Sequence, residues 1–92
     1  MPMIENISFT LEGLKDYIHW QTEDKKTLKK INQLIADIVR NGNTGLGHPE
    51  LLKHDLSGKW SRKIDEKNRL IYLIHDDKKI EIFSCRDHYG DK

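Results

Sequence analysis

The stretch from Gly47 to Arg62 mixes a carboxylate, lysines, an arginine, histidines and a tryptophan, a set that is awkward to bury and suited to binding phosphate. Metal-free cleavage of RNA needs a base for the 2′-hydroxyl proton, cations that stabilise the extra phosphate charge, and an acid for the leaving 5′-oxygen. Glutamate suits the base, arginine the cation and histidine the acid. Glu50 in this stretch, with Arg69 and His88 downstream, provides these residue types.

The same three residues have ordinary structural interpretations. Glu50 fits an exposed surface carboxylate, and His88 fits a solvated side chain near the C-terminus. Arg69, at the expected start of a strand, fits an ion pair with Glu66 or Asp87. The residue types alone therefore leave a ribonuclease as one candidate among several.

Histidine and cysteine do not indicate a metal or a cofactor. His48 and His54 are not accompanied by further ligands at zinc-like spacing, so we expect structural or solvent-exposed roles for them. Cys85 alternates with Phe83 along an expected strand and is interpreted as a small buried residue rather than a nucleophile. We therefore expect a site with no metal and no cofactor.

The composition predicts one domain, residues 1–92. Hydrophobic residues make up 36% of the chain and charged residues 34%, and the formal net charge of +1 does not by itself indicate nucleic-acid binding. Basic residues gather between Lys53 and Arg69, which favours a locally basic face. The single cysteine, and the lack of an apolar run of about 20 residues, predict a cytoplasmic protein with no membrane span.

The spacing of apolar residues predicts a short strand followed by two helices. Residues 3–9 have the composition of the strand, and Thr10 is expected to cap a first helix that ends near Trp20. Thr22 is expected to cap a second helix, whose apolar stripe runs to a stop at Asn41-Gly42. Its lysines lie mostly off this stripe and are interpreted as a solvated helix face.

A period of two takes over after a glycine-rich loop at residues 41–49. It predicts one strand after Gly58, a near-continuous apolar strand over 69–74 and a third over 79–85, joined by short polar turns into an antiparallel meander. The predicted fold is α+β, with two N-terminal helices packed on one face of a small, mostly antiparallel twisted sheet. The residues expected mostly in the core are Ile71, Leu73, Ile80, Ile82 and Phe83.

The geometry of the expected hairpins predicts where polar side chains meet. A turn centred near Asp77 places the start of one strand opposite the end of the next, so Arg69 lies within a few residues of Arg86 and His88. The preceding turn brings Arg62 beside the strand that begins at Arg69. We therefore expect these residues to share one end or one face of the sheet.

Several short segments, each weak alone, together carry a specific family resemblance over nearly the whole chain. They are Tyr17-x-x-Trp20-Gln21, Lys29-Lys30-Ile31-Asn32-x-Leu34-Ile35, Gly45-x-Gly47-x-Pro49-Glu50-x-Leu52-Lys53, His54-x-Leu56-Ser57-Gly58-x-Trp60-Ser61-Arg62, Arg69-Leu70-x-Tyr72 and Cys85-Arg86-x-His88-Tyr89. In these segments the chain resembles the YoeB/Txe family of bacterial toxins, within the RelE/ParE-like superfamily. The resemblance implies a RelE-like microbial RNase fold.

The resemblance also implies an activity: ribosome-dependent endonucleolytic cleavage of mRNA in the A site, without metal. It implies that Glu50 is the general base, Arg69 the transition-state cation and His88 the general acid. The residues expected to bind substrate are Lys53, Lys63 and Tyr89, which match family positions, and Arg62, which belongs to the expected anion cradle. The implied partners are a YefM/Axe-type antitoxin, whose C-terminal segment covers the active site, the ribosome with its mRNA, and a second copy of the chain.

Two departures from the family pattern and two alternatives accompany this interpretation. Relatives commonly carry two arginines where this chain has Arg62-Lys63, and lysine keeps the charge but loses the bidentate fork. The chain also continues beyond Tyr89, where close relatives often stop. One alternative is a ParE-like, non-nuclease toxin that inhibits a topoisomerase. The other is a catalytically silent module that binds the antitoxin or the ribosome.

Overall fold

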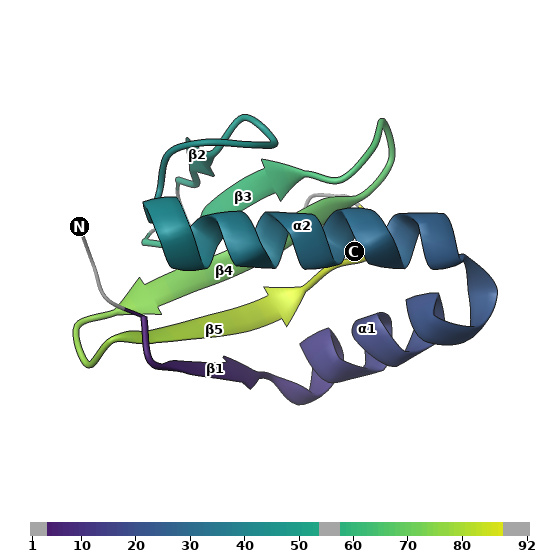
Figure 1. The fold of residues 1–92 in the computed structure, drawn as a ribbon, viewed down its shortest axis with the longest axis horizontal. Coiled ribbons are helices and arrows are strands. Elements are labelled where there is room, and N and C mark those ends of the chain that lie inside the picture. The colour runs from purple at the N-terminus through teal and green to yellow at the C-terminus, as the bar shows by residue number, and fades with distance from the viewer. Residues whose placement is uncertain (1–3, 54–57, 88–92) are drawn as a thin grey trace.

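The computed structural model describes residues 4–53 and 58–87. Along the chain, one strand is followed by two helices and then by the remaining strands of the sheet. Figure 1 shows the second helix lying across the sheet, while the first helix follows the N-terminal strand at one end of the sheet. The elements are β1 (Asn6–Phe9), α1 (Leu11–Glu23), α2 (Lys25–Asn41), β2 (Glu50–Leu51), β3 (Trp60–Lys63), β4 (Arg69–His75) and β5 (Lys79–Ser84).

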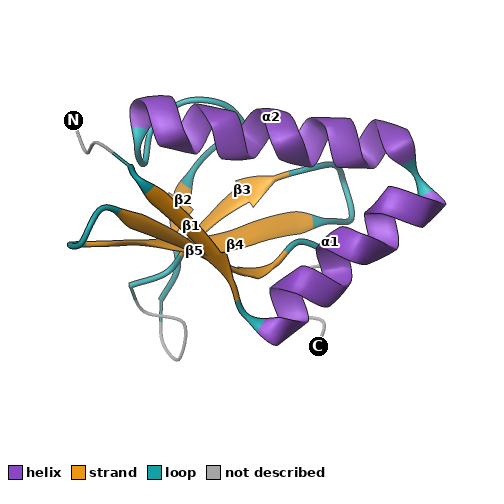
Figure 2. Ribbon diagram, turned by 60° about the horizontal axis from the view of Figure 1, so that its bottom comes forward, coloured by secondary structure: helices purple, strands orange, loops and turns teal. Residues whose placement is uncertain are grey.

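The strands form one sheet in the order β1-β5-β4-β3-β2. β2, β3, β4 and β5 pair antiparallel, and β1 pairs parallel with β5. Both helices cover the same face, and the other face carries no helix (Figure 2). The predicted fold class and the β3–β4–β5 meander are confirmed.

Two edge features of the sheet were not predicted. β2 has two residues, Glu50 and Leu51, too few to show a period-two pattern. β1 lies within the predicted strand of residues 3–9, of which Met3 is outside the described residues. The sequence does not predict that β1 pairs parallel with β5. The chain between β1 and β5 passes through α1, α2, β2, β3 and β4, which is far longer than the dozen or so residues that joining a parallel pair requires.

The predicted N-cap of the first helix is confirmed, and that of the second is wrong. The Oγ1 atom of Thr10 accepts a hydrogen bond from the backbone N–H of Gly13 at 3.0 Å. α1 continues to Glu23, and Asp24, in an extended conformation, caps α2 by accepting from the N–H groups of Lys26 and Thr27. Asp24 prevails over Thr22 because its two carboxylate oxygens satisfy several unpaired donors at once.

The helical C-cap falls where the sequence predicted it. Gly42 ends α2 with a φ of 71°, a left-handed conformation that favours glycine, and its N–H donates to the carbonyl of Ile38 at 2.9 Å. The chain then enters the predicted loop, which leads to β2. No helix among the described residues is long and apolar enough to cross a membrane.

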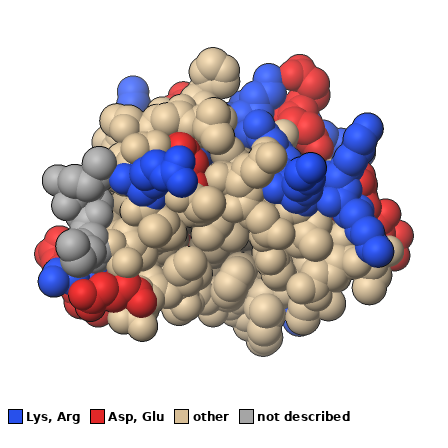
Figure 3. All heavy atoms as spheres, in the orientation of Figure 1, with Lys and Arg blue, Asp and Glu red and all other residues tan. Residues whose placement is uncertain are grey.

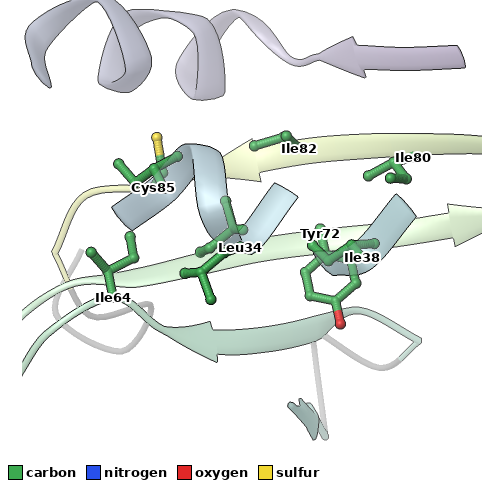
Figure 4. Packing of buried hydrophobic residues seen from close by; sticks show 9 residues of the cluster. Leu34, Ile38, Ile64, Tyr72, Ile80, Ile82 and Cys85 are labelled. Carbon is green, nitrogen blue, oxygen red and sulfur yellow. The ribbon is translucent and has the colours of Figure 1, made fainter. Parts of the chain in front are cut away.

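The core lies between α2 and the covered face of the sheet (Figure 4). Its buried members are Ile31, Leu34, Ile38, Ile64, Leu70, Tyr72, Ile80, Ile82 and Cys85. The expectations for Ile80, Ile82 and Cys85 are therefore confirmed. Ile71 is also buried, at 3% exposure, although it lies outside this cluster. The expectations for Leu73 and Phe83 are corrected, since both are only half-buried. Alternation turns Leu73 away from the helices, and Phe83 lies at a β-bulge, where β5 has one residue more than β4.

Candidate active site on the helix-free face of the sheet

The helix-free face collects three of the expected site residues from three strands. β2 brings Glu50 opposite Ser61 of β3, and Lys63, two residues further along β3, lies opposite Arg69 of β4. Cross-strand partners point to the same face, and so do residues two apart along a strand. Glu50, Lys63 and Arg69 therefore share the face that the helices leave open.

Arg69 is tied to the end of the described chain. Its backbone N–H donates to the carbonyl of Asp87 at 3.1 Å, and the N–H of Asp87 donates to the side chain of Asn68 at 2.7 Å. The predicted proximity of Arg69 to the segment after β5 is thereby confirmed as far as Asp87. His88 and Tyr89, the expected acid and the expected terminal aromatic, lie outside the described residues.

The Arg69 side chain keeps donors available. Its Nε atom is buried, and among residues 4–53 and 58–87 it has no hydrogen-bond partner. A buried, unpaired donor is costly, and such groups often mark functional sites. A phosphate oxygen is an acceptor that matches the guanidinium fork.

Lys63 is held by a weak partner. Its Nζ atom lies 2.6 Å from the Oε2 atom of Glu66, and the Glu66 side chain is 90% exposed. The hydrogen bond from Lys63 lowers the pKa of Glu66, so this carboxylate stays ionised. Exposed ion pairs contribute little, so a phosphate can take the ammonium from Glu66 at small cost.

The polar side chains at the edges of this face are exposed, whereas Ser61 and Ile71 in its centre are buried. Glu50 and Lys53 are both exposed, on and just after β2. Arg86, exposed beyond the end of β5, is available to solvent. No three metal-ligating side chains come together in the described part of the chain.

Arg62 does not lie on this face, contrary to the expectation that it binds substrate. Between Ser61 and Lys63, alternation turns it toward α2, where it is 0% exposed. All five guanidinium N–H groups donate within the protein, which leaves none for phosphate. The acceptors are the Tyr72 hydroxyl (3.2 Å), the Asp37 carboxylate (2.5 Å) and the carbonyls of Leu46 (3.0 Å), Gly42 (2.7 Å) and Thr44 (3.0 Å).

The Arg62 side chain instead holds the loop that precedes Glu50. Three of its hydrogen bonds end on loop carbonyls, and the backbone N–H of Lys63 donates to the carbonyl of Gly47 at 2.7 Å. The Arg62 hydrogen bond lowers the pKa of Asp37, so the pair remains ionised. Arg62 is therefore a positioning residue, and its burial explains why this loop has a fixed course despite its glycines.

Two other surface features lie away from the helix-free face. Figure 3 shows basic side chains gathered over the N-terminal end of α2, where Lys25, Lys26 and Lys29 are exposed. A hollow of about 660 Å³ opens between β1 and α2, and none of the expected site residues lines it.

The structure thus has two helices on one side of a sheet, with a carboxylate and cations on the other side (Figure 2). A family model described as "YoeB-like toxin of bacterial type II toxin-antitoxin system" matches residues 9–89, and the chain belongs to that family.

Individual relatives agree over most of their length. The chain is 52% identical over 83 residues to Toxin YoeB of Streptomyces coelicolor, which covers 90% of this chain and 98% of the relative. The toxin in a YoeB–YefM complex from Staphylococcus aureus is 45% identical, with a TM-score of 0.85 and coverage of 91% of this chain and 97% of that chain. A YoeB dimer from the same organism has a TM-score of 0.85 at 45% identity, and the match covers 95% of this chain and 99% of that chain.

Proposed function

We propose that this toxin is a ribosome-dependent endoribonuclease that cleaves mRNA in the A site by metal-independent acid–base catalysis. The observation that carries the proposal is the placement of Glu50, Lys63 and Arg69 on one open face of the sheet. The family membership supports a toxin role. The proposal requires no cofactor.

Each group has a role in the proposed cleavage. Glu50 removes the 2′-hydroxyl proton, and the 2′-oxygen attacks the adjacent phosphorus. Arg69, assisted by Lys63 and Lys53, stabilises the negative charge that develops on the phosphorane. His88 protonates the 5′-oxygen as its bond to phosphorus breaks, and Tyr89 contacts the substrate. The products are a 2′,3′-cyclic phosphate upstream, which water opens to a 3′-phosphate, and a 5′-hydroxyl downstream.

The proposed partners follow the same relatives. The S. aureus relative was solved in complex with YefM, and also as a dimer. We accordingly assign this chain a YefM/Axe-like antitoxin, whose acidic or amphipathic tail orders over the basic open face and blocks it. We also assign it the capacity to form a homodimer and a working location in the cytoplasm, where translating ribosomes are found.

Primer extension on mRNA from translating ribosomes tests the proposed activity. With the toxin present, new 5′ ends are expected inside the reading frame at codons in the A site, and the downstream fragment is expected to carry a 5′-hydroxyl. A parallel assay follows the supercoiling of plasmid DNA, which should stay intact. Intact mRNA together with lost supercoiling would instead support a topoisomerase inhibitor.

A further inference from the structure

An aromatic ring lies on the helix-free face beside the candidate site. Phe83 of β5 is half-buried, and it is absent from the core cluster that contains its neighbours Ile82 and Cys85. The ammonium of Lys59 lies over this ring, 4.4 Å from its centroid. Lys59 immediately precedes Trp60, which packs toward the core, so alternation also places Lys59 on the helix-free face.

The sheet register places Phe83 close to the expected catalytic residues. Glu50, Ser61, Ile71 and Ser84 form a row across β2, β3, β4 and β5. Strands are about 4.8 Å apart, so this row spans about 14 Å from Glu50 to the residue next to Phe83. Arg69 is on β4, the strand that adjoins β5, and it lies two residues before Ile71.

We propose that Phe83 and Lys59 form a nucleobase subsite for the RNA strand next to the scissile phosphate. In the free protein Lys59 covers the ring. In the complex a base stacks on the Phe83 ring, and the Lys59 ammonium moves to a phosphate of the same strand. This subsite rests on the proposed nuclease function and adds a binding element that the expected site residues do not include.

The relative strengths of the two interactions favour this exchange. A cation–π pair at a partly exposed site contributes about a two- to fivefold change in an equilibrium constant. Stacking one base on an aromatic side chain contributes about five- to 150-fold. The displaced ammonium is not lost to water, because the RNA strand supplies a phosphate for it. Every base has a flat face, so the subsite is expected to accept all four bases.

Single-turnover cleavage of mRNA on programmed ribosomes tests the subsite. Phe83→Leu keeps an apolar side chain but removes the aromatic face, so cleavage efficiency (the maximal rate divided by the half-saturating toxin concentration) should fall about tenfold. Phe83→Trp should stay within about twofold of wild type, because indole also stacks. Phe9→Leu makes the same chemical change on β1, outside the site, and should cleave like wild type.

The salt dependence of cleavage tests the proposed phosphate contact of Lys59. Lys59→Met should weaken cleavage and reduce the slope of log efficiency against log salt by about one, because one phosphate contact is lost. Lys25→Met, at an exposed position on α2, should leave both quantities unchanged. Circular dichroism and the urea midpoint of each variant establish that it is folded before rates are compared.

The outcomes separate this inference from the function on which it rests. If Phe83→Leu cleaves as efficiently as Phe9→Leu, the subsite is wrong and the lysine–ring pair is only a surface packing contact. If Glu50→Gln in the same assay also cleaves like wild type, the assignment of Glu50 as the base is wrong, and if the wild-type protein does not cleave, the nuclease function itself is wrong. A loss with Glu50→Gln and none with Phe83→Leu overturns the subsite alone.

Discussion

Arg69 shows most clearly how a single residue combines structure and chemistry. Its backbone N–H donates to the carbonyl of Asp87, while its Nε atom, buried, has no partner among the described residues. The backbone contact ties Arg69 to the segment after β5, and the described residues provide no acceptor for the buried Nε donor. A pentavalent phosphate has such acceptors in the transition state.

Replacing Arg69 by lysine tests the need for the planar fork. Lysine keeps the charge but cannot donate two parallel hydrogen bonds, so the cleavage rate should fall about 10²- to 10³-fold. The measurement is the single-turnover rate at saturating toxin. Arg40→Lys makes the same change at an exposed position of α2 and should have no effect. Equal rates for the two variants would remove Arg69 from the chemistry.

The residue types indicate which chemistry the site could perform, but they do not indicate which side chains are accessible to a substrate. Arg62 and Lys63 are adjacent basic residues, and the period of two places Arg62 on the side of Trp60 and Ile64, but an arginine at such a position does not by itself indicate burial. One strand step decides it: Lys63 reaches the open face, while Arg62 is buried with Asp37 of α2. The sequence predicts a core position for Phe83 because the residue is apolar. Apolar character alone does not specify whether a strand residue lies on the face that the helices cover or on the other face.

At the scale of elements, the ion pair between buried Arg62 and partly buried Asp37 connects α2, the loop after it and β3. Burial raises the pKa of the Tyr72 hydroxyl, against the effect of Arg62, so Tyr72 stays neutral and accepts the Arg62 hydrogen bond. The loop before Glu50 is thus positioned by side-chain bonds rather than by regular secondary structure. Sequence periodicity carries no information about such a contact, because its members are 25 residues apart.

The pH dependence of stability should report this pair. The pKa of Asp37 in the folded state lies below its ordinary value of 3.8, because Arg62 donates to the carboxylate. Its contribution is therefore complete above about pH 4 and is lost as the pH falls through the folded-state pKa. Asp37→Asn should be less stable than wild type at pH 7 by about 3–5 kcal/mol, and the gap should narrow below pH 4.

Urea denaturation at pH 7, 5 and 3 measures that gap. Asp76→Asn, in the exposed turn between β4 and β5, provides a matched control with little expected effect at any of these pH values. A gap between Asp37→Asn and wild type that stays constant from pH 7 to pH 3 would show that the Asp37 charge does not stabilise the fold.

The sequence predicts helix and strand boundaries where the residue at the boundary itself determines the end of the element. Thr10 and Gly42 act at helix ends as their residue types indicate. The N-cap of α2 is Asp24, two residues after the expected Thr22. Threonine and aspartate are both good N-caps, so residue type alone does not show which of them begins the helix. β2 and the parallel position of β1 depend on long-range pairing, for which a single sequence gives no local signal.

The whole molecule is two layers, and Gly13 sets how closely they approach. A Cβ atom at this position of α1 would lie 2.5 Å from the carbonyl oxygen of Ile82 in β5. The usual effect of a glycine within a helix is to destabilise it. Here the missing side chain allows α1 to lie directly on β5, the strand that carries Phe83.

Gly13→Ala should therefore destabilise the protein, against the usual gain from alanine in a helix. We expect a loss of about 1–3 kcal/mol in the free energy of unfolding, since backbone atoms must move to make room. Urea denaturation measures it, with Gln21→Ala on the exposed side of α1 as the control. A Gly13→Ala protein as stable as wild type would mean that the two layers separate without cost.

The central claim is that the open face of the sheet cleaves RNA with Glu50 as its base, and the cleavage rate of Glu50→Gln tests it most directly. Glutamine keeps the size of the side chain and removes the base, so the single-turnover rate on programmed ribosomes should fall about 10²- to 10⁴-fold. Glu23→Gln, the same change at the exposed end of α1, should cleave at the wild-type rate. Equal rates for Glu50→Gln and Glu23→Gln would contradict the account.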